Sequence, residues 1–417
     1  MKYHIWHPFT QHGIDKEMPE IASASGAWIT DTTGKAYWDG ISSWWVNLHG
    51  HAHPFIAERV YEQMKTLEHV IFSGFTHQPA KELTERLARY FPDEQVRFFF
   101  SDNGSTAVEV AVKLAIQYVK QARGAKKVKV LALKGSYHGD TFGSMAVAER
   151  SVFTDPWDDL LFDVVHIEAP VAGKEQACFE AIRKEADQHT LLVYEPLVQG
   201  AGGMRMYTPQ ALEEMLSVAR NAGALLIADE VMTGFYRTGT MLASVQTSVF
   251  PDLVCLSKGL TGGALPMGMT ACAGFLFDAF LDDRLERGFL HGHSFTGNPV
   301  GCAAALASLD LLESDDTQKA VQRICMTLED IRNYLIKCEH LVHVRRCGTV
   351  LAMELPGTGG YLHPKRDALY AAFMKRGLLI RPLGNTIYLL PPYCSTDDEL
   401  WLAAHAIEEV ANELMKA

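Results

Sequence analysis

The segment LLIADEVMTGF, residues 225–235, joins a continuous apolar run to two consecutive carboxylates. The segment LVCLSKGLTGG, residues 253–263, has the same form, with a lysine shortly after its apolar run. Continuous apolar runs are typical of strands that are buried on both faces of a parallel sheet. Ligands of such sheets bind beyond the carboxyl ends of the strands, so Asp229 and Lys258 are the first candidates for a functional site.

Further apolar runs of strand length alternate with amphipathic helical stretches on both sides of these segments. The seven strand candidates are residues 96–100, 128–133, 164–167, 191–194, 225–228, 253–256 and 269–273. Alternating strands and helices predict an α/β fold in which helices cover both faces of a mostly parallel seven-stranded sheet. A length of 417 residues favours more than one domain.

The two ends of the chain have a different pattern. Residues 1–50 combine an irregular start with a hairpin at 27–38, whose turn is DTTG. The last hundred residues contain a helical stretch at 316–338, several short strands and a final helix at 397–415. We therefore predict an N-terminal segment at 1–50 that packs with a small α+β domain at 315–417, and a large domain at 51–314.

Charge and cysteine content limit the possible partners and compartment. The chain has 38 basic and 50 acidic residues, a formal charge of −12, which disfavours binding to nucleic acid or to an anionic membrane. No stretch approaches the ~20 apolar residues of a membrane helix. None of the eight cysteines lies in a C-x-x-C pair or in zinc-ligand spacing. This composition predicts a reduced, cytoplasmic protein without a metal site.

Two other predicted strands end in segments that could complete a site with Asp229 and Lys258. Gly104 and Ser105 open a strongly helical run, and Tyr137 follows the strand at 128–133. Taken one at a time, each residue has an ordinary structural interpretation. Lys258 could be a surface charge and Asp229 a helix cap. Gly104 and Ser105 could form a turn, and Tyr137 could be a core aromatic. Together they suit pyridoxal 5'-phosphate, which needs a lysine amine, a carboxylate for its ring nitrogen, helix-start N–H groups for its phosphate and an aromatic neighbour. Lys258, Asp229 and Tyr137 are the predicted catalytic residues.

A family resemblance supports this interpretation. The segment at 226–235, with Lys258 placed 258 − 229 = 29 residues after Asp229 and followed by Gly262 and Gly263, resembles the signature of class III aminotransferases. That family belongs to fold type I of the pyridoxal-phosphate enzymes. The resemblance implies that fold, the cofactor, and a homodimer with its sites at the subunit interface.

Other motifs narrow the resemblance. They are IWHPFTQ at 5–11, DGISSWW at 39–45, YHGDTFG at 137–143, EPLVQGAGGMRM at 195–206, IRPLG at 380–384 and PPY at 391–393. These are similar to the biotin-pathway branch of the family, the 7,8-diaminopelargonic acid aminotransferases. That branch transfers an amino group onto 8-amino-7-oxononanoate, usually from S-adenosylmethionine.

The resemblance also implies roles for substrate-binding residues. Arg381 lies where the family binds the substrate carboxylate, and a guanidinium fork offers two parallel donors to such a group. Trp44 lies where the family packs an indole against the substrate's methylene chain; without the resemblance, core packing would be the preferred interpretation. Arg237 is a second candidate for substrate contact. Gly292, His293 and Ser294 match the segment that reaches the neighbouring subunit's cofactor phosphate, although the family often has Pro-Thr at the last two positions.

Two positions bear on the choice of substrates. Many ω-aminotransferases of this class have a glutamate after Gln-Gly, where this chain has Ala201, which argues against ornithine or 4-aminobutyrate. Relatives that use S-adenosylmethionine commonly have a tyrosine where this chain has Phe9, and a lysine-using variant resembles this chain there. The alternatives left open are lysine as the donor, another class III ω-amino acid or diamine transferase, and a different pyridoxal-phosphate reaction. A nucleotide-binding protein is disfavoured, because no G-x-G-x-x-G or P-loop motif occurs.

Overall fold

The structure is a computed structural model that describes residues 4–14, 18–357 and 360–416. Its centre is a seven-stranded sheet with the strand order β4-β12-β11-β10-β7-β5-β6. The strands are Arg97–Ser101 (β4), Lys129–Leu133 (β5), Val165–Ile167 (β6), Thr190–Tyr194 (β7), Leu225–Asp229 (β10), Leu253–Leu256 (β11) and Gly268–Cys272 (β12). Only β12 runs antiparallel to its two neighbours in this sheet. The predicted α/β fold with a mostly parallel seven-stranded sheet is therefore confirmed.

Successive residues of the central strands point to opposite faces of the sheet, and a separate apolar core forms on each face. On one face Leu225 and Ile227 pack in a cluster with the apolar side of α4, which includes Ala111. On the other face Leu226 packs in a larger cluster that includes Leu212 of α7. The helices around this sheet are Pro54–Thr66 (α2), Gln78–Ala88 (α3), Gly104–Ala122 (α4), Phe142–Val147 (α5), Glu175–Glu185 (α6), Pro209–Asn221 (α7), Gly274–Asp278 (α8) and Pro299–Leu312 (α9).

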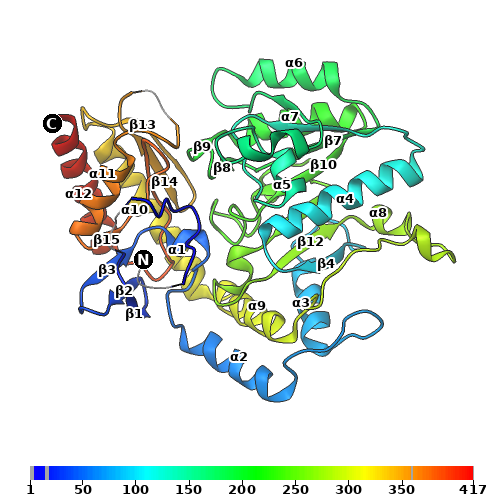
Figure 1. Cartoon of the computed structure of the whole chain (residues 1–417), viewed down its shortest axis with the longest axis horizontal. Helices are drawn as coiled ribbons and strands as arrows, with labels where there is room; N and C mark the ends of the chain where they lie inside the picture. Colours follow the sequence, from blue (N-terminus) through cyan, green and yellow to red (C-terminus); the bar gives the residue numbers. More distant parts are fainter. Residues whose placement is uncertain (1–3, 15–17, 358–359, 417) are drawn as a thin grey trace.

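The C-terminal part forms a smaller α+β unit that shares a sheet with the N-terminal strands. Its elements are Asp315–Leu335 (α10), Val342–Cys347 (β13), Val350–Glu354 (β14), Arg366–Lys375 (α11), Leu378–Leu379 (β15), Thr386–Leu389 (β16) and Asp397–Lys416 (α12). The strands Ile21–Ser25 (β1), Trp28–Asp31 (β2) and Ala36–Asp39 (β3) form a meander, and β3 pairs in parallel with β15. Figure 1 shows these blue strands beside the orange and red C-terminal helices. The domain boundaries at 50 and 314 stay predictions.

We call the seven-stranded sheet with its helices the large part, and the C-terminal unit with β1–β3 the small part. A short turn that the sequence did not predict follows β3 and leads toward the large part. Its residues, Ser42–Trp45 (α1), have φ values of 51°, 45°, 71° and 75°. Left-handed backbone costs an L-residue roughly 1–2 kcal/mol per residue, so four in succession need strong support from their surroundings. The turn brings two consecutive tryptophans to the junction between the two parts of the molecule.

Two short strands, Val198–Gln199 (β8) and Arg205–Met206 (β9), form a hairpin after β7. This hairpin carries Ala201 on its turn and faces the small part, where Arg345 of β13 donates hydrogen bonds to Gly203 O and Met204 O. The helices within the described ranges include none that is both long and apolar enough to cross a membrane.

Candidate active site

Lys258 and Asp229 lie side by side at the carboxyl edge of the sheet. Their strands β10 and β11 are parallel neighbours, with Asp229 paired to Cys255. Lys258 begins the turn after β11 with φ 46°, and its Nζ lies 4.4 Å from the ring centroid of Trp45. Burial lowers the pKa of Lys258 to about 8, although the carboxylates of Asp229 and Glu195 oppose that fall. A neutral amine is therefore accessible to Lys258 near neutral pH, as a nucleophile or base requires.

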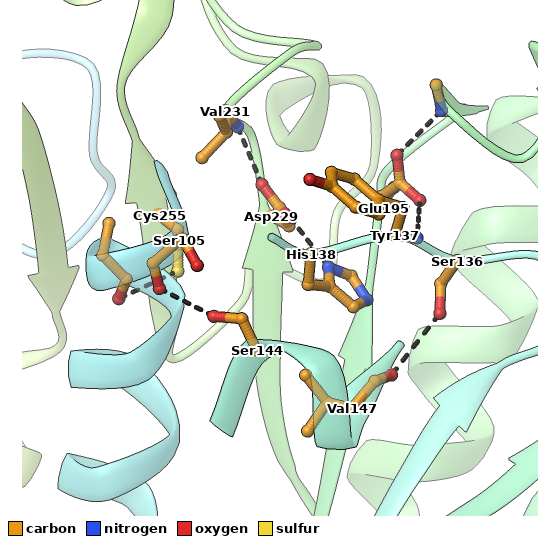
Figure 2. Close-up of polar contacts among 12 residues, drawn as sticks. Ser105, Ser136, Tyr137, His138, Ser144, Val147, Glu195, Asp229, Val231 and Cys255 are labelled. Atoms are coloured by element: carbon orange, nitrogen blue, oxygen red, sulfur yellow. Dashed lines mark hydrogen bonds and ion pairs between the residues drawn. The ribbon is translucent and has the colours of Figure 1, made fainter. Parts of the chain in front are cut away.

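Asp229 is oriented by two hydrogen bonds. Its Oδ2 lies 2.7 Å from Nδ1 of His138, and its Oδ1 accepts the N–H of Val231 at 3.0 Å. Figure 2 shows Asp229 at the strand end between these partners. Burial alone would lower the pKa of His138, but the hydrogen bond and charge of Asp229 outweigh burial and raise it. The pair thus holds a fixed carboxylate at the sheet edge beside Lys258.

A second buried carboxylate, Glu195, follows β7 at the same edge. Its Oε1 accepts the N–H of Tyr137 at 3.2 Å, and its Oε2 accepts the N–H of Gly200 at 2.8 Å. Figure 2 shows the Glu195 carboxylate joined by a dashed line to the backbone nitrogen of Tyr137. Burial raises the pKa of Glu195 to about 7, which the charge of His138 partly opposes and that of Asp229 reinforces. Glu195 therefore joins the loops after β5 and β7, and it lies within the electrostatic range of Lys258.

The start of α4 provides free backbone donors. Asn103 caps the helix: its side chain accepts the N–H of Thr106, and the Thr106 hydroxyl accepts the N–H of Asn103. The first N–H groups of a helix have no intrahelical partner, so those of Gly104 and Ser105 point to whatever lies in front of the helix. Ser105 is fixed by a hydrogen bond from the N–H of Thr141 to its Oγ at 2.9 Å. A Cβ at Gly139 would lie 2.4 Å from the same Oγ, so only glycine fits there.

A cavity of about 480 Å³ opens between this edge and the small part. One side of it is lined by Tyr137, Asp140, Phe153 and Ala201, and the residues of the other side include Tyr361 and Thr386. The hydroxyl of Tyr137 donates to Asp140 Oδ2 at 2.8 Å. Burial raises the pKa of Tyr137, and Asp140 raises it further, so the phenol stays a proton donor at neutral pH. The cavity thus has an aromatic wall, and the Asp140 carboxylate is held beside the Tyr137 hydroxyl.

Phe9, Trp44 and Arg381 meet beside this cavity although they come from three distant segments. The guanidinium carbon of Arg381 lies 5.2 Å from the ring centroid of Trp44. Phe9 packs edge-on against Trp44 at 5.3 Å and against Phe153 at 5.9 Å between ring centroids. Phe9 and Trp44 are 44% and 37% exposed. This arrangement combines an apolar surface with a cation at one end.

Arg237 lies apart from that surface. It is 1% exposed, and its guanidinium donates to the backbone oxygens of Pro391 at 2.8 Å and Asn47 at 3.2 Å. These contacts tie the large part to the small one, whereas its predicted contact with substrate stays a prediction.

Gly292 and Ser294 are exposed, and His293 Nδ1 lies 3.3 Å from Asp102 Oδ2 of the same chain. Asp102 directly precedes the cap of α4. The segment therefore lies near a helix start that could bind phosphate, and its predicted reach into a neighbouring subunit stays a prediction.

Comparison with known proteins identifies the family. The model of the class III aminotransferases matches residues 11–411. The chain belongs to the class III aminotransferase family. A relative from Synechococcus elongatus, an adenosylmethionine-8-amino-7-oxononanoate aminotransferase, is 46% identical over 99% of both chains. The crystal structure of an adenosylmethionine-8-amino-7-oxononanoate aminotransferase from Methanocaldococcus jannaschii superimposes with a TM-score of 0.92 at 30% identity. The match covers 98% of this chain and 97% of that one.

An amine transaminase from an uncultivated Pseudomonas species, in its PLP-bound form, also superimposes with a TM-score of 0.92 at 29% identity, covering 99% of each chain. This aminotransferase is accordingly a pyridoxal-phosphate enzyme of fold type I. Its residues fit the cofactor: the Lys258 amine lies over the Trp45 ring, Asp229 is a fixed carboxylate, and the start of α4 offers N–H groups that have no partner within the helix. His138 Nε2, among the described atoms, is buried without a hydrogen-bond partner, which marks an incomplete polar environment at the same place.

Sequence reasoning missed three residues of this aminotransferase's site: Glu195, His138 and Asp140. Glu195 directly follows a predicted strand, as Asp229 does, so the strand-end rule could have found it. His138 and Asp140 flank Gly139 in the motif that was chosen for Tyr137 alone. Their hydrogen bonds to Asp229 and Tyr137 depend on the path of the loop, which the sequence does not reveal.

Proposed function

We propose that this aminotransferase converts 8-amino-7-oxononanoate to 7,8-diaminononanoate, the amino-transfer step of biotin synthesis, with S-adenosylmethionine as the amino donor. The relatives named for this reaction match the whole chain. The observation that carries the proposal is that the Arg381 guanidinium lies over the Trp44 ring, against which Phe9 packs. A cation at the end of an apolar surface suits a carboxylate on a methylene chain.

Ala201 supports a substrate pair of this kind over ornithine or 4-aminobutyrate. It lies on the cavity wall in the β8–β9 turn, where a longer acidic side chain would be needed to cover Arg381. Alanine leaves Arg381 available in both halves of the reaction. The second candidate is a diamine or ω-amino acid transferase, which predicts turnover with pyruvate or 2-oxoglutarate as the acceptor and none with 8-amino-7-oxononanoate.

The bound cofactor supplies an electron sink for the carbon that loses its proton. Lys258 supplies the amine that holds the cofactor, and the same amine carries the substrate proton between carbon atoms. Asp229, fixed by His138, would stabilise a protonated ring nitrogen of the cofactor. The N–H groups of Gly104 and Ser105 would bind its phosphate. Tyr137, whose hydroxyl is held by Asp140, would provide the aromatic neighbour of the ring.

The region around Phe9 bears on the choice of amino donor. A tyrosine there would add a hydroxyl to the aromatic surface, and Phe9 lacks it. Lysine is for this reason the alternative donor, because a lysine-using variant of the family resembles this chain at the same position. The two donors differ in charge and bulk near Phe9, Trp44 and Phe153, so this cluster is where the choice between them is made.

We further propose a homodimer in which Gly292, His293 and Ser294 reach the phosphate of the partner subunit. Leu290 and Phe295 on either side of this segment are 68% and 60% exposed. Large apolar side chains exposed on one segment support an interface there. All eight cysteines are free thiols, which fits the cytoplasmic location that we propose. Light scattering on the holoenzyme should give twice the chain mass of 46.3 kDa.

The test of the reaction is an assay of the holoenzyme with 8-amino-7-oxononanoate and each donor offered separately. Formation of 7,8-diaminononanoate, measured by mass spectrometry, is expected with S-adenosylmethionine. Product with lysine alone would replace the donor and keep the acceptor. No product with either donor, together with turnover of simple ω-amines and pyruvate, would reject the biotin-pathway reaction.

A further inference from the structure

The left-handed turn Ser42–Trp45 holds two tryptophans against two different cations. Trp44 lies 5.2 Å from the Arg381 guanidinium, and Trp45 lies 4.4 Å from the Lys258 amine. Trp45 is also fixed by its Nε1, which donates to the hydroxyl of Tyr388 at 2.9 Å. The turn therefore lies between the proposed carboxylate anchor and the proposed catalytic amine, and its backbone sets both contacts.

This backbone is unfavourable in isolation, because all four residues carry a Cβ and have positive φ. The buried carboxylate of Asp39 stabilises this unfavourable backbone. Asp39 is 0% exposed, and it accepts the Ser43 hydroxyl at 2.8 Å and the N–H of Ile41 at 3.3 Å. Both donors belong to the turn or to the residue just before it, so Asp39 holds the turn at its start.

His51 completes the network as a neutral donor. The N–H of Gly50 donates to Asn47 Oδ1 at 2.8 Å, which fixes the orientation of the Asn47 amide. Asn47 Nδ2 therefore donates to His51 Nδ1 at 3.1 Å, and the proton of the imidazole lies on Nε2. That N–H donates to Asp39 Oδ2 at 2.9 Å. Asp39 thus has three donors, and its hold on the turn does not require a protonated histidine.

We propose that Asp39 is a positioning residue, which holds the Ser42–Trp45 turn in its left-handed form and so presents Trp44 to the substrate chain and Trp45 to Lys258. The part that concerns substrate rests on the proposed function, whereas the part that concerns the turn does not. The role of Asp39 toward Arg381 and Lys258 is indirect, because it acts through the backbone of the turn that carries Trp44 and Trp45.

The first test replaces Asp39 by asparagine. The holoenzyme of Asp39→Asn is expected to show a KM for 8-amino-7-oxononanoate raised about tenfold, the size expected when one charge-assisted hydrogen bond is lost. The matched control is Asp31→Asn, which removes a carboxylate of the same meander that accepts from Thr33 and Tyr37, away from the cavity. That control should leave the KM within twofold. A KM within twofold for Asp39→Asn as well would overturn the proposal.

The second test separates backbone support from general stability. Glycine adopts positive φ without a steric penalty, whereas alanine retains the Cβ. Asp39→Asn/Ser43→Gly should recover most of the loss in KM, and Asp39→Asn/Ser43→Ala should not. Equal behaviour of the two double variants would overturn the proposal. If Asp39→Asn does not fold, the single variants Ser43→Gly and Ser43→Ala are compared in the same way.

The third test does not depend on activity. The near-ultraviolet circular dichroism of the cofactor-free protein contains a Trp44 signal, obtained as the difference from Trp44→Phe. Asp39→Asn should lose at least half of that difference signal, and Asp31→Asn should keep it. A retained signal would overturn the role of Asp39 even if the wild-type enzyme proves inactive on 8-amino-7-oxononanoate, so the failure of the proposed function can be told apart from the failure of this inference.

Discussion

The two ends of the site are built in opposite ways. At the cofactor end, Asp229 ends one strand of the sheet and Lys258 and Glu195 follow two others, and both carboxylates are buried. At the substrate end, Phe9 and Trp44 are 44% and 37% exposed and meet Arg381 from a distant segment. A sheet edge gathers residues by its topology alone, whereas the substrate end depends on how separate segments pack. The cofactor end should therefore tolerate less change, and the substrate end should vary in specificity.

The largest effect is expected at Lys258. Lys258→Ala should remove steady turnover, a loss of at least roughly 10²–10⁴-fold, because the proton carrier is absent. Cofactor should still bind through the α4 start, and its release can be followed by absorbance after dialysis. Borohydride reduction and peptide mapping of the wild type should label position 258; a label elsewhere would assign the cofactor end to another residue.

Asp229 is expected to come next. Asp229→Asn keeps the shape but loses the charge, and kcat should fall by about 10²–10³-fold, the size seen when one preorganised electrostatic group is removed. His138→Asn serves as a milder companion variant, since it removes only the partner that orients Asp229. Steady-state kinetics with saturating substrates measure both. A near-normal rate for Asp229→Asn would refute its role.

The lowered pKa of Lys258 predicts a pH dependence for the cofactor-free protein. Because the neutral amine is the reactive form, modification of Lys258 by limiting acetic anhydride should be half-maximal near pH 8 and should be lost as the pH falls below that value. An ordinary lysine gives a midpoint near ~10.4. Mass spectrometry of the labelled peptide gives the profile. Glu195→Gln should move the midpoint lower, since Glu195 opposes the fall of this pKa; a wild-type midpoint near 10 would contradict the enclosed amine.

Arg381 tests the substrate end of the site. Arg381→Ala should raise the KM for 8-amino-7-oxononanoate roughly 10–100-fold, because a charge-assisted hydrogen-bonding partner is worth about 1.5–3 kcal/mol. The kcat should change less than the KM. Arg381→Lys keeps the charge but lacks the two parallel donors of the guanidinium, so its KM should lie between those of the wild type and Arg381→Ala. An unchanged KM for Arg381→Ala would remove it from the carboxylate site.

The smallest effect is expected at Phe9, and it sharpens the assignment of the donor. Phe9→Tyr adds a hydroxyl and should raise kcat/KM for S-adenosylmethionine about 2–10-fold, the worth of one neutral hydrogen bond. The value for lysine should stay within twofold. Donor kinetics at fixed acceptor concentration measure the ratio, and an equal change for both donors would mean that Phe9 does not discriminate between them.

The sequence was sufficient for the sheet and for the part of the site that the sheet gathers. All seven strands lie where apolar runs predicted them, and Asp229 and Lys258 occupy adjacent strand ends. The turn at Ser42–Trp45 could not be predicted, because its left-handed backbone opposes the local preference of every residue in it. The position of Arg237 was equally hidden: its burial depends on backbone oxygens of Pro391 and Asn47, which are far away in the chain.

The hydrogen bonds between the small and large parts have a consequence for thermal unfolding. Arg345 of β13 donates to Gly203 O and Met204 O, and the hydroxyl of Tyr393 donates to Phe235 O. One apolar cluster contains residues of both parts, among them Leu226 and Ile387, so separating the parts would expose this shared core to water. The two parts should therefore melt together, and calorimetry should record one endotherm rather than two.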